Sequence, residues 1–126
     1  MSRLRSYCLL LVVLVGSMVA VTSAYAAPRT PPVIEVVTLK IVPGTTVETF
    51  RAVDRDVERQ HVARQPGFLS RESAPGRDGS WLVIVHWRSA ADAQASMDSF
   101  EKAPAAARFM SLIVPGSMQM TRYGGR

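Results

Sequence analysis

The chain has 126 residues, of which 48% are hydrophobic and 20% are charged, and its formal net charge at pH 7 is +5. This length and composition correspond to one small folded domain. The sequence has no low-complexity tract and no internal repeat, which excludes multidomain enzymes, solenoids and disordered proteins. The basic residues between Arg51 and Arg108 are scattered singly among acidic ones, so we expect a solvated surface of mixed charge and no nucleic-acid partner.

Residues 1–26 have the pattern of a cleavable signal peptide. Arg3 and Arg5 supply a positive start, residues 9–21 are apolar, and small residues precede the predicted cleavage site after Ala26. A membrane anchor is the alternative, but the apolar stretch is shorter than the roughly 20 residues that span a bilayer. We therefore expect an exported protein, periplasmic or secreted, without membrane attachment after cleavage.

Cleavage would remove the only cysteine, Cys8, and would lower the formal charge by two, from +5 to +3. The remaining chain would have neither a disulfide nor a thiol nucleophile. Its stability must then come from a hydrophobic core or from a partner subunit. Residues 27–32 contain three prolines and are predicted to be a flexible leader before a single domain over residues 33–126.

The domain is predicted to begin with a strand and a helix. Residues 33–42 are rich in branched side chains and end at Pro43-Gly44, which is typical of a strand followed by a turn. Thr45 and Glu48 have the spacing of a capping box, and the apolar residues that follow recur at helical spacing. These features predict a helix over residues 46–64.

Turn and cap signals also divide the rest of the domain into strands and helices. Pro66-Gly67 ends the first helix, Asp78-Gly79 marks a hairpin, and Ser89 is a helix cap. The predicted elements are strands over 68–73 and 80–88, a helix over 89–102, a short helical piece over 104–113 and a strand over 117–123. This order predicts an α+β, ferredoxin-like βαββαβ fold, an antiparallel sheet with its helices on one face.

Both faces of this sheet are predicted to be apolar. The third strand has two faces, one with Trp81, Val83, Val85 and Trp87 and the other with Leu82 and Ile84. In the first strand, Ile34 and Val36 lie on one face, and Val37, Leu39 and Ile41 lie on the other. The open face would then carry Val37, Leu39, Ile41, Leu82 and Ile84. Their exposure would forfeit roughly 1.5–3 kcal/mol for each large side chain. We therefore expect a homodimer through the open sheet face, in which two sheets close into a barrel.

The sequence resembles the antibiotic biosynthesis monooxygenase (ABM) family. The resemblance covers residues 33–123 and rests on His61-x-x-x-x-Pro-Gly-Phe-Leu-Ser-Arg-Glu, on Trp-Leu-Val-Ile-Val-His-Trp-Arg-Ser from Trp81, on the helix with Met97 and Phe100, and on the ending with Met-x-Met-Thr-Arg-Tyr. It implies a dimeric α/β barrel. The superfamily includes cofactor-free quinol monooxygenases, haem-degrading enzymes and members without an assigned activity, and fold alone does not fix function.

Two histidines are candidate catalytic residues. His61 continues the apolar stripe of the first helix and could be a general base facing a pocket; the alternative is a structural histidine at a helix end. His86 could line the barrel interior or form a hydrogen bond at the subunit contact. Their separation, without a cysteine or a paired ligand, predicts no metal site.

A second set of residues is predicted to bind a small aromatic substrate. Its members are aromatic or flexible apolar side chains that could line a cavity or simply fill the core: Trp81, Trp87, Met97, Phe100, Phe109 and Tyr123. Tyr123 could also donate a proton. Arg71 and Arg122 could hold an anionic group or lie on the surface.

The resemblance also argues against one activity, haem degradation. Haem-degrading relatives use an asparagine with a tryptophan and a histidine on the second helix, and this chain has no asparagine and no histidine in residues 90–102. The expected function is therefore an exported, ABM-like monooxygenase that oxidises a small aromatic or quinol-type substrate with dioxygen and without a cofactor. The alternatives are a binding or scavenging module with the same cavity, and a purely structural dimer.

Overall fold

The computed structural model describes residues 31–125. The predicted signal peptide and the first part of the leader lie outside the described residues. The elements are β1 (Val33–Lys40), α1 (Val47–Gln60), the 3-10 turn η1 (Val62–Arg64), β2 (Phe68–Pro75), β3 (Ser80–Trp87), α2 (Ala90–Phe100), α3 (Pro104–Ser111) and β4 (Gln119–Gly124). Within this range, none of the helices has the length and apolar character needed to cross a membrane.

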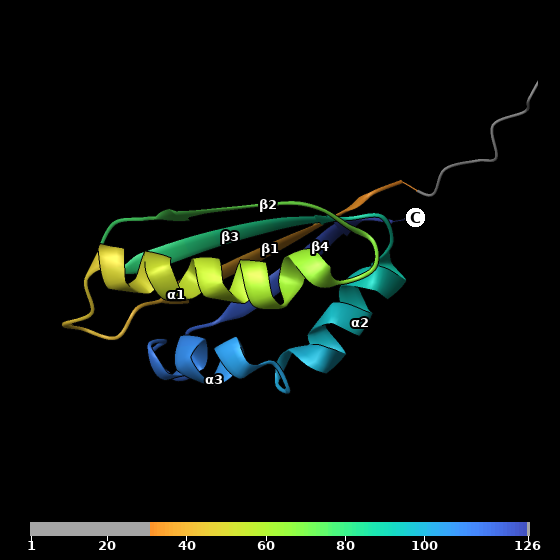
Figure 1. Cartoon of the computed structure of the whole chain (residues 1–126). Coiled ribbons are helices and arrows are strands. Elements are labelled where there is room, and N and C mark those ends of the chain that lie inside the picture. The colour runs from red at the N-terminus through yellow and green to blue at the C-terminus, as the bar shows by residue number, and fades with distance from the viewer. Residues whose placement is uncertain (1–30, 126) are drawn as a thin grey trace, which may run out of the picture.

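The four strands form one antiparallel sheet in the order β2-β3-β1-β4. The helices lie on one side of this sheet (Figure 1). Helix α1 runs along the length of the sheet, and α2 and α3 lie next to α1 on the same side. Every strand of the predicted set is present, and the α+β ferredoxin-like arrangement is confirmed. Among residues 31–125, no helix lies over the other side of the sheet (Figure 1).

Helix α1 begins one residue later than the capping-box spacing predicted. The N-cap is Thr46, whose Oγ1 accepts a hydrogen bond from the Thr49 backbone N–H at 3.1 Å, and not Thr45. The helix also ends earlier than residue 64. His61 leaves helical geometry at φ −129°, and the chain continues as η1. This break turns the chain toward the Pro66-Gly67 turn and β2.

The β2–β3 hairpin has the turn chemistry that its sequence predicted. Asp78 and Gly79 adopt φ values of +54° and +70°. Two consecutive positive φ values suit the twist of a hairpin, and Asp-Gly tolerates them better than most residue pairs. The turn therefore connects β2 to β3 in the register that places Trp81 opposite Pro75 and Trp87 opposite Phe68.

One prediction about the sheet faces is wrong. In β1, the helix-covered face carries Val33, Glu35, Val37 and Leu39, with Ile41 just beyond the strand end, because these residues pair with the buried side chains of β3. Val37, Leu39 and Ile41 therefore belong to the core and not to the open face. The open face of β1 carries Ile34 and Val36 instead, and in β3 it carries Leu82 and Ile84 as predicted.

Helix α2 begins with a reciprocal cap. Ser89 Oγ accepts a hydrogen bond from the Asp92 backbone N–H at 3.1 Å and donates one to the Asp92 carboxylate at 2.7 Å. The Ser89 hydrogen bond, with a further contribution from Arg88, lowers the pKa of Asp92 below its ordinary value. An acid with a lowered folded-state pKa contributes stability that is present above its unfolded pKa and is lost as pH falls through the folded one.

We expect Ser89→Ala to lower the free energy of unfolding by about 1 kcal/mol near neutral pH, because α2 loses its cap. The variant should also move the pKa of Asp92 back toward the ordinary value. The difference in stability between the wild type and Ser89→Ala should therefore shrink as pH falls through the lowered folded-state pKa of Asp92, below which Asp92 is protonated in both proteins. Urea unfolding of both proteins at neutral and acidic pH measures this difference, and a difference that is independent of pH would contradict the reciprocal cap.

Candidate functional site

A small cavity lies between the helices and the covered face of the sheet. Its volume is about 70 Å³. The walls come from β1, β2 and β3, from α1, η1, α2 and α3, and from Met118 just before β4. They are mostly apolar: Val37, Val57, Val62, Val83, Val85, Trp87, Met97, Phe100, Phe109 and Met118, with Glu35, Arg71 and Ser96 as the polar members. A mostly apolar cavity with a few convergent polar groups is the usual form of a small-molecule site.

The cavity adjoins a larger surface hollow. This outer hollow has a volume of about 600 Å³ and is lined by α2, α3 and Met118. The two spaces share three lining residues, Met97, Phe100 and Met118. Since a cavity of roughly 150 Å³ is known to admit benzene, the inner cavity alone is too small for an aromatic ring. Two of the shared residues are methionines, whose side chains are flexible. A movement of Met97 and Met118 away from Phe100 would join the two spaces.

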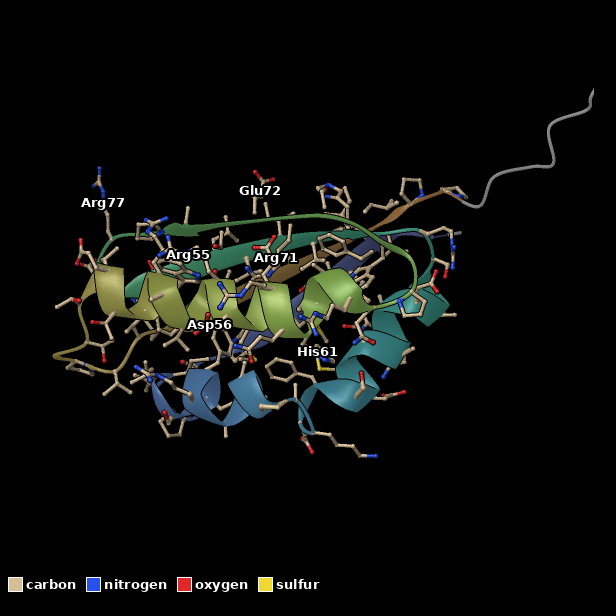
Figure 2. The ribbon with its side chains drawn as sticks, in the orientation of Figure 1. Arg55, Asp56, His61, Arg71, Glu72 and Arg77 are labelled. Carbon is tan, nitrogen blue, oxygen red and sulfur yellow. The ribbon has the colours of Figure 1, made fainter. Side chains whose placement is uncertain are left out.

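Arg71 is held at the cavity wall by a buried ion-pair network. Its guanidinium makes two hydrogen bonds to the Asp54 carboxylate, at 3.0 and 2.5 Å, and a longer one of 3.4 Å to Glu58. Ser73 donates to the same Asp54 carboxylate at 2.6 Å. The Asp54 and Arg71 side chains are 0% and 3% exposed. Figure 2 shows Arg71 pointing from β2 toward α1, whereas the next residue, Glu72, points to the opposite side of the sheet.

A second ion pair joins the central strand β1 to the edge strand β4. Glu35 is 5% exposed and accepts a hydrogen bond through Oε2 from Arg122 Nε at 2.7 Å. Arg122 also donates to Gln94 of α2 at 2.8 Å, which fixes the guanidinium over the sheet. Glu35 lines the cavity. A carboxylate is therefore presented to an apolar space with its position set by an arginine.

Two tryptophans have buried indole N–H groups without a hydrogen-bond partner within residues 31–125. Trp81 and Trp87 are each 1% exposed, and both Nε1 atoms lack a partner. A buried donor without an acceptor costs free energy, so such a group in a folded protein calls for an explanation. Only Trp87 lines the cavity. Trp81 packs edge-on against Phe50, with ring centroids 5.0 Å apart, in the core beneath α1.

The predicted substrate-binding residues separate into two groups. Trp87, Met97, Phe100 and Phe109 come together around the cavity. Trp81 lies in the core away from it, and Tyr123 is 57% exposed on the open face of the sheet, opposite Ile34. Trp81 and Tyr123 do not line the cavity, so their positions do not support substrate binding. That role stays a prediction for both residues.

Neither candidate catalytic histidine lines the cavity. His61 is buried, and both ring nitrogens have partners: Nε2 lies 3.0 Å from the Ser96 carbonyl oxygen and Nδ1 lies 3.3 Å from the Gln65 amide nitrogen. This arrangement joins the end of α1 to α2 (Figure 2). His86 lies on the open face, where its Nδ1 is 3.1 Å from Ser70 Oγ. A catalytic role for either residue stays a prediction.

Glu35 and Asp54 are the site residues that sequence reasoning missed. Glu35 interrupts an apolar strand at a position that was assigned to the open face. Asp54 follows Val53 on α1, next to the apolar stripe, and its local sequence does not distinguish it from the exposed charges of the helix. The residues described by the structure include no cluster of three histidine, cysteine, aspartate or glutamate side chains that could hold a metal ion.

A family model and a set of solved structures match this chain, the first showing its family and the second its fold. The family model of antibiotic biosynthesis monooxygenases matches residues 32–111. No curated protein matches significantly. Among solved structures, SnoaB of Streptomyces nogalater, a cofactor-independent oxygenase, is 20% identical, with a TM-score of 0.62 over 75% of this chain and 93% of that chain.

Two other solved structures show the range of proteins with this fold. A monooxygenase from the ActVA-Orf6 gene of Streptomyces coelicolor, in complex with nanaomycin D, is 20% identical, with a TM-score of 0.59 over 79% of this chain and 91% of that chain. NE2512 of Nitrosomonas europaea, of unknown function, is 12% identical, with a TM-score of 0.59 over 76% and 90% of the two chains. The match of the family model over most of the domain establishes that the chain belongs to the antibiotic biosynthesis monooxygenase family.

Proposed function

We propose that this protein is an exported monooxygenase that oxidises a small aromatic or quinol-type substrate with dioxygen and without a cofactor. The observation that carries the proposal is the apolar cavity lined by Glu35, a carboxylate, and by Trp87, whose buried indole N–H has no partner within residues 31–125. The solved structures with this fold include two oxygenases, one of them described as cofactor-independent.

The chemistry balances without an added reductant. A hydroquinone and dioxygen give a hydroxyquinone and water: one oxygen atom enters the ring, the other leaves as water, and the substrate supplies all of the electrons. Loss of a proton from a substrate hydroxyl produces an electron-rich anion that can transfer an electron to dioxygen. The cavity would bind this anion, exclude water from it and donate a hydrogen bond to its oxygen.

Trp87 is the donor that best fits this task. Its Nε1–H is buried and has no acceptor in the described part of the chain. A substrate oxygen at that point would satisfy a group that otherwise costs free energy in the empty protein. Preorganised donors aimed at a developing negative charge often contribute more to catalysis than any other single interaction.

Two further proposals concern the assembly and the location. The open sheet face carries Ile34, Val36, Leu82 and Ile84, and a second copy of the chain would remove them from water. Export rests on the signal-peptide pattern of residues 1–26. Binding without turnover is the second candidate function, and the observation that favours it is the position of both histidines outside the cavity.

Oxygen uptake with a panel of hydroquinones tests the proposed activity. We expect wild-type protein to consume dioxygen and Trp87→Phe to turn over about 100-fold more slowly, because the variant keeps an aromatic ring but loses the N–H donor. Trp81→Phe is the matched control, since its N–H is equally buried and unpartnered but does not face the cavity. Equal losses in both variants would point to packing and not to hydrogen bonding. Saturable binding without oxygen uptake would favour the binding module.

A further inference from the structure

We infer that Glu35 is the residue that recognises the substrate hydroxyl and takes its proton. This inference rests on the proposed function and names the base that it requires. It moves the expected base from the two histidines to a carboxylate on the central strand β1. The observations behind it are the burial of Glu35, its hydrogen bonds and its place in the cavity wall.

The position of Glu35 is unusual for a structural carboxylate. Its strand neighbours on the covered face are Val33 and Val37, and its cross-strand partner in β3 is Val85. Burying a charged group among such residues is unfavourable unless its hydrogen bonds are satisfied. Oε2 is satisfied by Arg122, whereas Oε1 has no hydrogen-bond partner within residues 31–125. One oxygen of a buried carboxylate is therefore left for a group that enters the cavity.

The other charged group of the cavity, Arg71, is already engaged. Arg71 has two short contacts with Asp54 and one with Glu58, and as a guanidinium it has no capacity to accept a proton. The Ser96 carbonyl lies 3.0 Å from His61 Nε2. Of the charged side chains that line the cavity, Glu35 alone is an acceptor.

Trp87 and Glu35 lie on the same face of neighbouring strands. Val85 stands opposite Glu35, and Trp87 is two residues further along β3, so the two side chains occupy a diagonal pair of positions. A hydroxyl between them could donate its proton to Glu35 and, once ionised, accept a hydrogen bond from Trp87. In this step the substrate O–H bond breaks, the proton moves to Glu35 Oε1 and the electron pair stays on the substrate oxygen.

The first test measures binding without turnover. Hydroquinone and its dimethyl ether have the same ring, but only hydroquinone can donate a hydrogen bond. With calorimetry under anaerobic conditions, we expect wild-type protein to prefer hydroquinone by about tenfold or more, because hydrogen bonds to charged groups are stronger than neutral ones. Glu35→Gln should reduce the preference to a few-fold. An unchanged preference in Glu35→Gln would overturn recognition by this residue.

The second test measures turnover with the same variant. Glu35→Gln preserves the size of the side chain and an oxygen that can accept from Arg122, but it cannot act as a base, so oxygen uptake should fall by about 100-fold or more. Glu35→Asp retains a carboxylate and should recover part of the rate, which a purely structural role would not predict. Glu48→Gln, at an exposed position in the first turn of α1, is the matched control and should keep the wild-type rate.

The two tests separate this inference from the proposed function. If the wild type and Glu35→Gln oxidised hydroquinone at the same rate, the role of Glu35 would be overturned and the proposed activity would stand. Wild-type protein that oxidises no hydroquinone would overturn the activity and the proton transfer, while the binding preference would still decide whether Glu35 recognises a hydroxyl.

Discussion

Asp54→Ala is expected to lower the free energy of unfolding by about 3–5 kcal/mol, because it leaves the buried guanidinium of Arg71 without its principal partner. The Asp54 side chain is fully buried and accepts hydrogen bonds from both Arg71 and Ser73. Glu58 provides only one longer contact at 3.4 Å, and its side chain is 36% exposed. For a domain of this size, such a loss corresponds to a decrease in melting temperature of roughly 12–40 °C.

A double variant separates the loss of the ion pair from the loss of packing. Asp54→Val combined with Arg71→Met replaces the pair with apolar side chains of comparable volume, which is often neutral or stabilising in protein interiors. We expect this double variant to unfold at a higher temperature than Asp54→Ala. Thermal unfolding followed by circular dichroism compares the two proteins. If Asp54→Ala melted within a few degrees of the wild type, the buried network would contribute little to the fold.

The order of elements could be predicted from the sequence because its turn signals are strong. Pro66-Gly67 and Asp78-Gly79 separate segments of clear helical or strand periodicity, and the observed boundaries of β3 and α2 differ from the predicted ones by only a few residues. The helix cap was displaced by one residue, since two adjacent threonines, Thr45 and Thr46, can both serve as caps and tertiary packing selects one of them.

The faces of β1 could not be predicted because both of its residue sets are apolar. The odd positions include Val37 and Leu39, and the even positions include Ile34 and Val36. An alternation of period two locates a face only when one set is polar, and a shift of one residue exchanges the faces completely. Glu35 belongs to the odd set, and its partner Arg122, 87 residues away in sequence, allows it to be buried.

The apolar half of the site was predictable, whereas its polar half was not. Met97, Phe100 and Phe109 belong to helical stripes whose burial follows from their spacing. The positions of Glu35 and Asp54 depend on arginines supplied by other strands, and local sequence patterns do not contain such pairings. His61 was a candidate because it continues the apolar stripe of the first helix, and His86 because it lies on the strand face of Leu82 and Ile84. The fold places His61 at a helix junction and His86 on the open face.

Ile84→Lys is expected to dissociate the proposed homodimer. Ile84 lies on the central strand pair of the open face, opposite Val36 of β1, and Ile34 and Leu82 on the same face are 38% and 36% exposed. In a symmetric dimer that buries this face, two copies of the new lysine would lose their hydration without gaining a partner. We expect the dimer to weaken by at least about 100-fold, or nearly 3 kcal/mol, as measured by sedimentation velocity over a range of concentrations.

The matched control for this experiment is Val47→Lys. Val47 is 39% exposed, comparable to the open-face residues, but it begins α1 on the opposite side of the sheet. If the open face is the interface, Val47→Lys should sediment as the wild-type dimer and Ile84→Lys as a folded monomer with increased exposure of apolar surface. A wild-type protein that is monomeric and stably folded at micromolar concentration would contradict the dimer. Ile34, Val36, Leu82 and Ile84 would then form an apolar surface in water, and the cavity beneath the helices would have to function within a single subunit.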